Sequence, residues 1–141
     1  MTTRKPLPEV YRQAADLIDR NGLCVGYYYD PDCLDETTST LTGDAALAAV
    51  ICERCPVCAA GGIILAAGAT PDQSWRAAAT ALCRFADYLA DRGDIDAAML
   101  TPDTPEDALE AIGTWSDGCA SAGQVTAALR AVADAAEGVS R

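Results

Sequence analysis

Apolar residues recur every three or four positions along much of the chain, which is the spacing of one face of an α-helix. This pattern predicts a helix over residues 6–21, ended by Asn21-Gly22, and a longer helix over 71–92, ended by Arg92-Gly93. The apolar stripe of the longer helix consists of Trp75, Ala79, Leu82, Ala86 and Leu89, with Phe85 beside it.

Two further helices are predicted from capping signals at their first residues. Thr104-Pro105 supplies a capping residue followed by proline at the first helical position, so we expect a helix to begin there. Ser121 and Gln124 match a capping box and predict the start of a last helix. Residues 116–120 are interpreted as the loop between these helices, and residues 95–100 as one short turn.

The first half of the chain is less regular. Alternating apolar positions predict a short extended arm near residues 23–29. One helix is expected over 44–54, and Pro56 is expected in the first turn of another that runs to residue 67. Gly61 and Gly62 in that helix each cost about 1 kcal/mol relative to alanine. We therefore expect another backbone to pack closely against them, at the centre of the fold.

These elements predict an all-α fold, a single compact bundle of about five to six helices with the short arm. The chain of 141 residues is long enough for one helical domain over 1–141, with disordered ends at 1–5 and 138–141. Its 29 alanines and aromatic content of 6% favour closely packed helices over a β-sandwich. No signal peptide is visible and the longest apolar stretch is too short to span a membrane. We therefore expect a cytoplasmic protein with reduced thiols.

The net charge of -11 limits the classes of macromolecule that the protein is expected to bind. A surface this negative repels nucleic-acid phosphates and anionic lipids, so we expect neither direct nucleic-acid binding nor membrane binding. It suits a partner protein with a basic surface, although an acidic surface can also serve solubility alone. Seven acids and one base occupy residues 91–110, where the candidate binding residues are Asp94, Asp96, Glu106 and Asp107.

The chain has no histidine, which removes the usual general base and the histidine-dependent nucleophile systems. We therefore expect a protein that is not an enzyme and that has no cofactor. The alternative with a cofactor is zinc, because Cys52, Cys55 and Cys58 have two overlapping CxxC spacings that Cys33 or Cys24 could complete. Reduced cysteines also pack as small buried apolar residues, which is the simpler interpretation.

Aromatic residues provide two further candidate contacts. The run Tyr27, Tyr28 and Tyr29 must point at least one ring outward if it is extended, which makes it a contact patch for a partner or for a second copy in a homodimer. Trp115 is expected to be a core anchor, and with Asp117 it could form part of a binding pocket or, in a third hypothesis, an apolar site for a catalytic carboxylate.

Three short segments together resemble a family known as domain of unknown function 6197. They are Asn21 to Gly26, Cys58 to Ile63, and Trp115 to Asp117 followed by Ser121, Gln124 and Val125. The family is found in small proteins of high-GC bacteria and their phages and has no assigned activity, so the resemblance implies a fold and a setting but no chemistry. Its pattern centres on Cys24 and Cys58, which makes a zinc site built on the whole cysteine cluster less expected.

The sequence therefore favours a non-enzymatic acidic helical binding or regulatory protein that engages a basic surface of a host protein. The resemblance implies that it is encoded by a phage or mobile element. The alternative is a small zinc-binding or ligand-binding protein that uses the Cys52, Cys55 and Cys58 cluster.

Overall fold

The computed structural model describes residues 6–24, 57–67, 78–101 and 104–139 of the chain, and these residues form helices joined by short connections. The elements are α1 (Leu7–Asn21), α4 (Ala59–Ala66), α5 (Ala79–Asp91), the 3-10 helix η2 (Ala97–Met99), α6 (Pro105–Gly118) and α7 (Ala122–Val139). The predicted all-α fold is confirmed. No helix within these ranges combines the length and apolarity needed to cross a bilayer.

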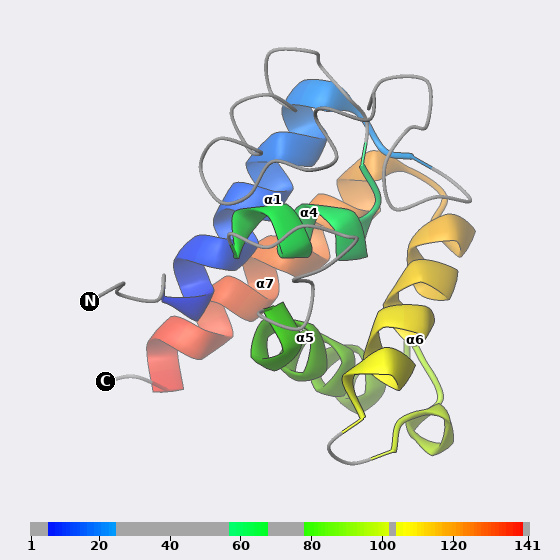
Figure 1. The fold of residues 1–141 in the computed structure, drawn as a ribbon. Helices are drawn as coiled ribbons and strands as arrows, with labels where there is room; N and C mark the ends of the chain where they lie inside the picture. Colours follow the sequence, from blue (N-terminus) through cyan, green and yellow to red (C-terminus); the bar gives the residue numbers. More distant parts are fainter. Residues whose placement is uncertain (1–5, 25–56, 68–77, 102–103, 140–141) are drawn as a thin grey trace, which may run out of the picture.

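Helices α1 and α7 lie side by side and run in opposite directions (Figure 1). Arg12 of α1 forms ion pairs with Asp134 (2.9 Å) and Glu137 (2.6 Å) of α7. Arg130 of α7 makes the reciprocal contacts with two aspartates of α1. Exposed ion pairs contribute little free energy one by one, but two clusters at different levels fix the register of the two helices.

Helix α4 lies at the centre of the fold, and all eight of its residues are buried. A Cβ atom built on Gly62 would lie 3.4 Å from the Cβ of Ala14 and 3.5 Å from its carbonyl oxygen, both in α1. For Gly62 this confirms the expectation that another backbone packs closely. The helix contacts α1, α5 and α6, so it joins the α1–α7 pair to the rest of the bundle.

An aromatic cluster connects α1, α5 and α6. The ring of Phe85 is fully buried, with its centroid 6.0 Å from that of Tyr11 and 5.7 Å from that of Trp115. The hydroxyl of Tyr11 donates a hydrogen bond of 2.8 Å to the carbonyl of Ala81, so its one polar atom is satisfied inside the core. Trp115 is half-buried and packs against the core through this edge contact, as its expected anchoring role requires.

The start of α4 differs from the prediction. We expected Pro56 in the first turn, but the helix begins at Ala59. Val57 instead forms an isolated parallel bridge with Leu23, in which its amide donates to Gly22 and its carbonyl accepts from Cys24. These bonds hold the backbone extended until Cys58 and so delay the helix. The bridge also places Leu23, the first residue of the predicted arm, in extended conformation.

The ends of α6 also differ in part from the prediction. Thr104 precedes the first helical residue as expected, but its side chain makes no capping hydrogen bond. The helix continues to Gly118, through the first part of the loop predicted for 116–120, and within this stretch the buried hydroxyl of Ser116 accepts a hydrogen bond from the amide of Ala59.

The predicted ends of α1 and α5 agree with the structure, and the capping box agrees in part. Gly22 and Gly93 have positive φ angles of 99° and 80°, which suits glycine at these stops. Ser121 accepts from the amide of Gln124, whose side chain accepts in turn from the amide of Ala120. In a capping box the side chain of Gln124 is expected to accept from the amide of the cap residue, Ser121; here it accepts from the amide of the residue before it.

Candidate functional site

The structure describes some of the candidate site residues and not others. Tyr27, Tyr28 and Tyr29, the three cysteines Cys33, Cys52 and Cys55, and the expected core residue Trp75 lie outside the described residues. So do the predicted helix over 44–54 and residues 71–77 of the longest predicted helix. The structure therefore places the acidic residues, Cys58, Trp115 and Asp117.

Cys58 caps the buried helix α4. Its backbone is extended, and its Sγ atom accepts a hydrogen bond of 3.5 Å from the amide of Gly61. Burial raises the pKa of the Cys58 thiol to about 11, although the amide contacts of Gly61 and Ala60 act in the opposite direction. At neutral pH the residue is a neutral thiol in a structural role.

A cluster of metal-ligating side chains does not form within the part of the chain that the structure describes. Three of the four cysteines in the predicted zinc site lie outside that part, so the zinc site stays a prediction. Metals bind the thiolate form of cysteine, so zinc would have to deprotonate the Cys58 thiol. Metal analysis of protein purified without chelator tests the prediction.

The raised pKa of Cys58 predicts a loss of stability at alkaline pH. Below pH about 9 the thiol is neutral in both the folded and the unfolded chain; above it, the unfolded chain ionises more readily. Between pH 9 and 11 the free energy of unfolding of the wild type should therefore fall, by on the order of 2 kcal/mol, relative to that of Cys58→Ser. Urea denaturation at pH 8, 9, 10 and 11 measures the difference.

Cys58→Ser is the matched control because a serine hydroxyl also caps a helix but does not titrate in this range. Taking the difference between the two proteins removes the contributions of the other cysteines and of the tyrosines. Parallel pH profiles for wild type and variant would contradict the assignment of a buried neutral thiol.

Asp117 lies on the surface near the end of α6. An exposed carboxylate lacks the apolar surroundings that the hypothesis of a catalytic aspartate requires. Neither Trp115 nor Asp117 lines the two pockets described below. The structure does not bring this pair into a common binding site within the described residues.

Several predicted acidic residues have local structural roles. Asp94 pairs with Arg92 at 3.2 Å, Asp96 accepts from the amide of Ala98 at the start of η2, and Asp107 accepts from the amide of Thr101. Glu106 lies exposed in the first turn of α6, where a carboxylate offsets the positive end of the helix dipole. Apart from the partly buried Asp107, these residues are exposed, so their charges also face solvent.

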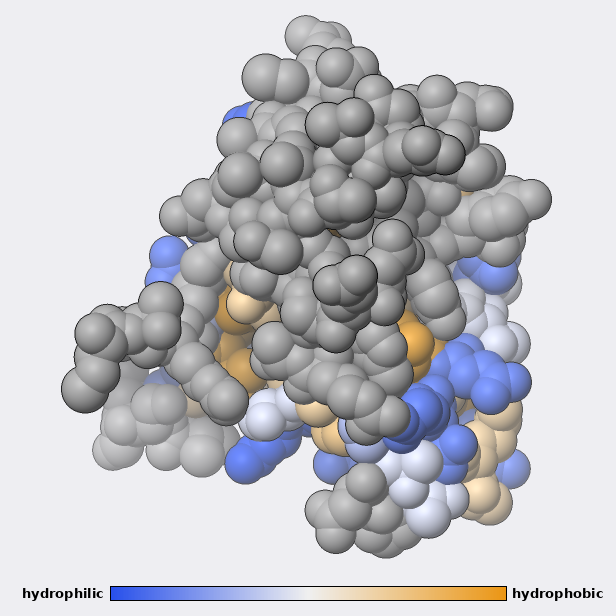
Figure 2. All heavy atoms as spheres, viewed as in Figure 1, coloured by the Kyte–Doolittle hydropathy of each residue, from blue (hydrophilic) through white to orange (hydrophobic). Residues whose placement is uncertain are grey.

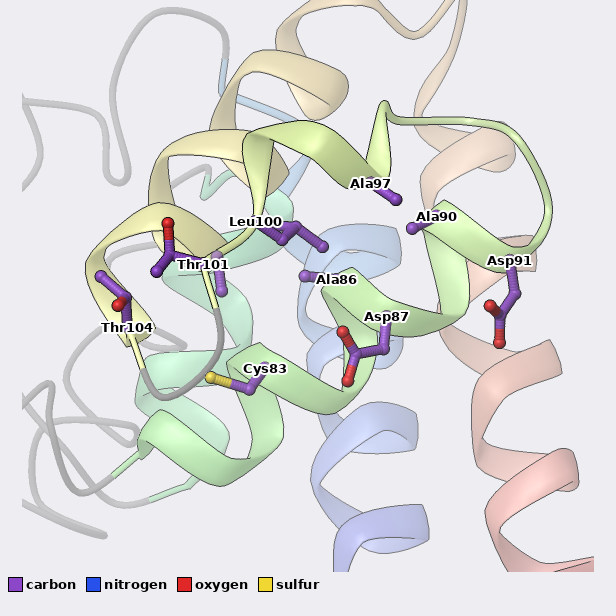
Figure 3. Close-up of a pocket in the computed structure, with 10 residues that line it drawn as sticks. Cys83, Ala86, Asp87, Ala90, Asp91, Ala97, Leu100, Thr101 and Thr104 are labelled. Atoms are coloured by element: carbon purple, nitrogen blue, oxygen red, sulfur yellow. The ribbon is translucent and has the colours of Figure 1, made fainter.

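A pocket of about 610 Å³ lies between α5, η2 and the start of α6. In Figure 3, Ala90 and Ala97 face each other at one end of it, and Cys83 lies at the other end, toward Thr101. Asp87 and Asp91 project from α5 one helical turn apart. The other lining residues are Ala86, Leu100, Thr104 and Ala108.

A second pocket, of about 660 Å³, lies on the other side of α5, toward α1 and α7. Asp87 and Asp91 line this pocket as well, together with Arg84, Tyr11 and Tyr88. The two aspartates therefore form a ridge with a hollow on each side. We call Asp87 and Asp91 the acidic ridge of α5.

Sequence reasoning did not select Asp87, because the acidic segment it recognised began at residue 91. The available signal was the spacing of four residues between Asp87 and Asp91 on a predicted helix, which puts both carboxylates on one face. The hydroxyl of Ser116 had no comparable signal, since its burial depends on contact with α4.

A model of a family described as Family of unknown function (DUF6197) matches residues 2–135. The match includes every described element except the last residues of α7. No curated protein and no solved structure matches the chain.

Proposed function

The chain belongs to this family of unknown function, and we propose that it is a non-enzymatic acidic helical protein that binds, and thereby regulates, a partner protein with a basic surface. The observation that carries the proposal is the unequal distribution of charge between the two sides of the helical bundle.

Acidic residues are concentrated on α5, α6 and the segment that connects them. Residues 79–118 hold nine acids and two arginines, whereas the whole chain has 21 acids and 10 bases. One of the two arginines, Arg92, pairs with Asp94 and lies 5.4 Å from the centroid of the Tyr88 ring. In the view of Figure 2, hydrophilic residues gather over the start of α6.

The charges of α1 and α7 are balanced more closely. These helices carry five acids and three arginines, and two of the arginines hold four of the acids in ion pairs: Arg12 holds Asp134 and Glu137, and Arg130 holds Asp16 and Asp19. Among the described helices, α5 and α6 therefore form the side that attracts a basic surface most strongly. Opposite charges on two protein surfaces raise the rate of association and disfavour binding of other proteins. Salt screens this attraction.

Capture of partners by two charge variants tests the proposal. The acidic-side variant carries Asp87→Asn, Asp91→Asn, Glu106→Gln and Glu110→Gln. The control variant carries Asp16→Asn, Asp19→Asn, Asp134→Asn and Glu137→Gln, which changes the net charge by the same amount on the α1–α7 side. Each protein is immobilised and exposed to host lysate over a series of salt concentrations, and the retained proteins are identified.

We expect a retained protein with a basic surface, whose apparent affinity falls about tenfold between about 0.05 and 0.3 M salt. At low salt, the apparent affinity of the acidic-side variant for this protein should be at least tenfold lower than that of the wild type. The affinity of the control variant should stay within about twofold of wild type. Equal losses in the two variants, or retention that does not depend on salt, would contradict the proposal. Thermal melts of both variants show that each is folded.

A further inference from the structure

We propose that the pocket between α5, η2 and α6 binds the side chain of a lysine from the partner's basic surface. This inference rests on the proposed function and assigns a specific contact to it. The ligand class is an alkyl chain that ends in an ammonium group. Three properties of the pocket carry the inference: the sign of its charges, the size of its wall residues, and its contrast with the neighbouring pocket.

The charged residues that line the pocket are both negative. They are Asp87 and Asp91 of the acidic ridge, and both are exposed at its mouth. A third carboxylate, that of Asp107, is bonded to the amide of the lining residue Thr101. The positive end of α6 also lies near the pocket, and Glu106 with Asp107 in its first turn offsets that field. The electrostatic preference of the pocket is therefore for a cation.

The walls of the pocket suit an alkyl chain. Four of the ten lining residues are alanines, and Leu100 adds an apolar surface opposite Ala86 (Figure 3). The small alanine side chains leave the pocket open. The four methylene groups of a lysine can pack against its apolar walls while the ammonium group stays near water. Thr101 and Thr104 are also among the lining residues.

The pocket on the other side of α5 has a different charge balance. It shares Asp87 and Asp91 with the first pocket, but Arg84 also lines it. A positively charged guanidinium group beside the same two aspartates reduces the attraction for a second cation. Of the two hollows beside the acidic ridge, the one toward η2 is therefore the lysine site.

An NMR titration with a small lysine probe tests the inference. The probe is Nα-acetyl-lysine methylamide, and its neutral counterpart is Nα-acetyl-norleucine methylamide, which has the alkyl chain without the ammonium group. The amide resonances of the full chain are followed. We expect saturable shifts centred on residues 86–91 and 97–101 with the lysine probe, and at least fivefold weaker binding of the norleucine probe.

Two matched variants separate the pocket from the general negative charge. Ala97→Leu fills the pocket and leaves every charge in place. Ala98→Leu is its control, because Ala98 is an exposed neighbour that does not line the pocket. Lysine binding should weaken at least fivefold in Ala97→Leu and stay within twofold of wild type in Ala98→Leu. Spectra of the two variants without probe show that both are folded.

Equal binding of the two probes, equal binding by the two leucine variants, or a lysine titration without saturation would overturn the inference. None of these results affects the proposed function, which depends on salt-sensitive capture and on the two charge variants. Conversely, if the lysine probe binds but no captured partner depends on salt or on the acidic side, the proposed function fails while the pocket stands as a site for lysine-like cations.

Discussion

Replacing Phe85 with alanine is expected to lower the free energy of unfolding by about 3 to 5 kcal/mol. The side chain is fully buried, and its ring contacts Tyr11 of α1 and Trp115 of α6. Truncation removes these contacts and leaves a cavity where three helices meet, since the small residues around it cannot extend to fill the space. Folded domains of this size are stable by about 5 to 15 kcal/mol, so the variant should be close to its stability limit.

Urea denaturation measures this effect, and Phe85→Leu is the matched control. Leucine keeps much of the apolar volume but removes the aromatic edges, so we expect it to lose less than half as much stability as the alanine variant. A loss of under about 1 kcal/mol for Phe85→Ala would show that the ring does not hold α1, α5 and α6 together.

Valine at position 62 is the second substitution with a large expected effect. The Cβ of any residue there would already lie 3.4 Å from the Cβ of Ala14. The two further methyl groups of valine must therefore displace α1 or α4, and overpacking of this kind costs about 1 to 3 kcal/mol, with the upper end expected where backbone lies opposite. The melting temperature and the urea midpoint should both fall.

Gly62→Ala is the control that isolates packing from helix propensity. Its Cβ would make ordinary van der Waals contact, and alanine favours helix over glycine by about 1 kcal/mol. We expect this variant to lie within about 1 kcal/mol of wild type, on the stable side if α1 need not move. Equal losses in Gly62→Ala and Gly62→Val would contradict the close approach of α1 to α4.

The sequence was sufficient for features that depend on nearby residues. The apolar spacing of α1 and α5, the stops at Gly22 and Gly93, and the capping box at Ser121 are all local, and each agrees with the structure. The central position of the Gly61-Gly62 segment also followed from sequence, because two glycines in a helix require a compensating contact.

Features that depend on distant residues could not be predicted. The start of α4 is set by hydrogen bonds between Val57 and the segment after α1, more than thirty residues away in the sequence. The burial of Ser116 near the end of α6 depends on contact with α4, whose Ala59 amide donates to its hydroxyl. The pocket beside the acidic ridge exists because η2 and the start of α6 fold back over α5, and no local pattern encodes that arrangement.

The pairing of α1 with α7 has a consequence for how the chain acquires its structure during synthesis. Arg12 and Glu137 are 125 positions apart, so the partner surface of α1 is made only after more than a hundred further residues have been synthesised. Until then the apolar face of α1 lacks α7, which with α4 is one of its two main neighbours among the described helices. Closure of so long a loop also slows the final step of folding. Nascent chains that stop before α7 should therefore stay protease-sensitive, and completion of α7 should bring protection in a single step.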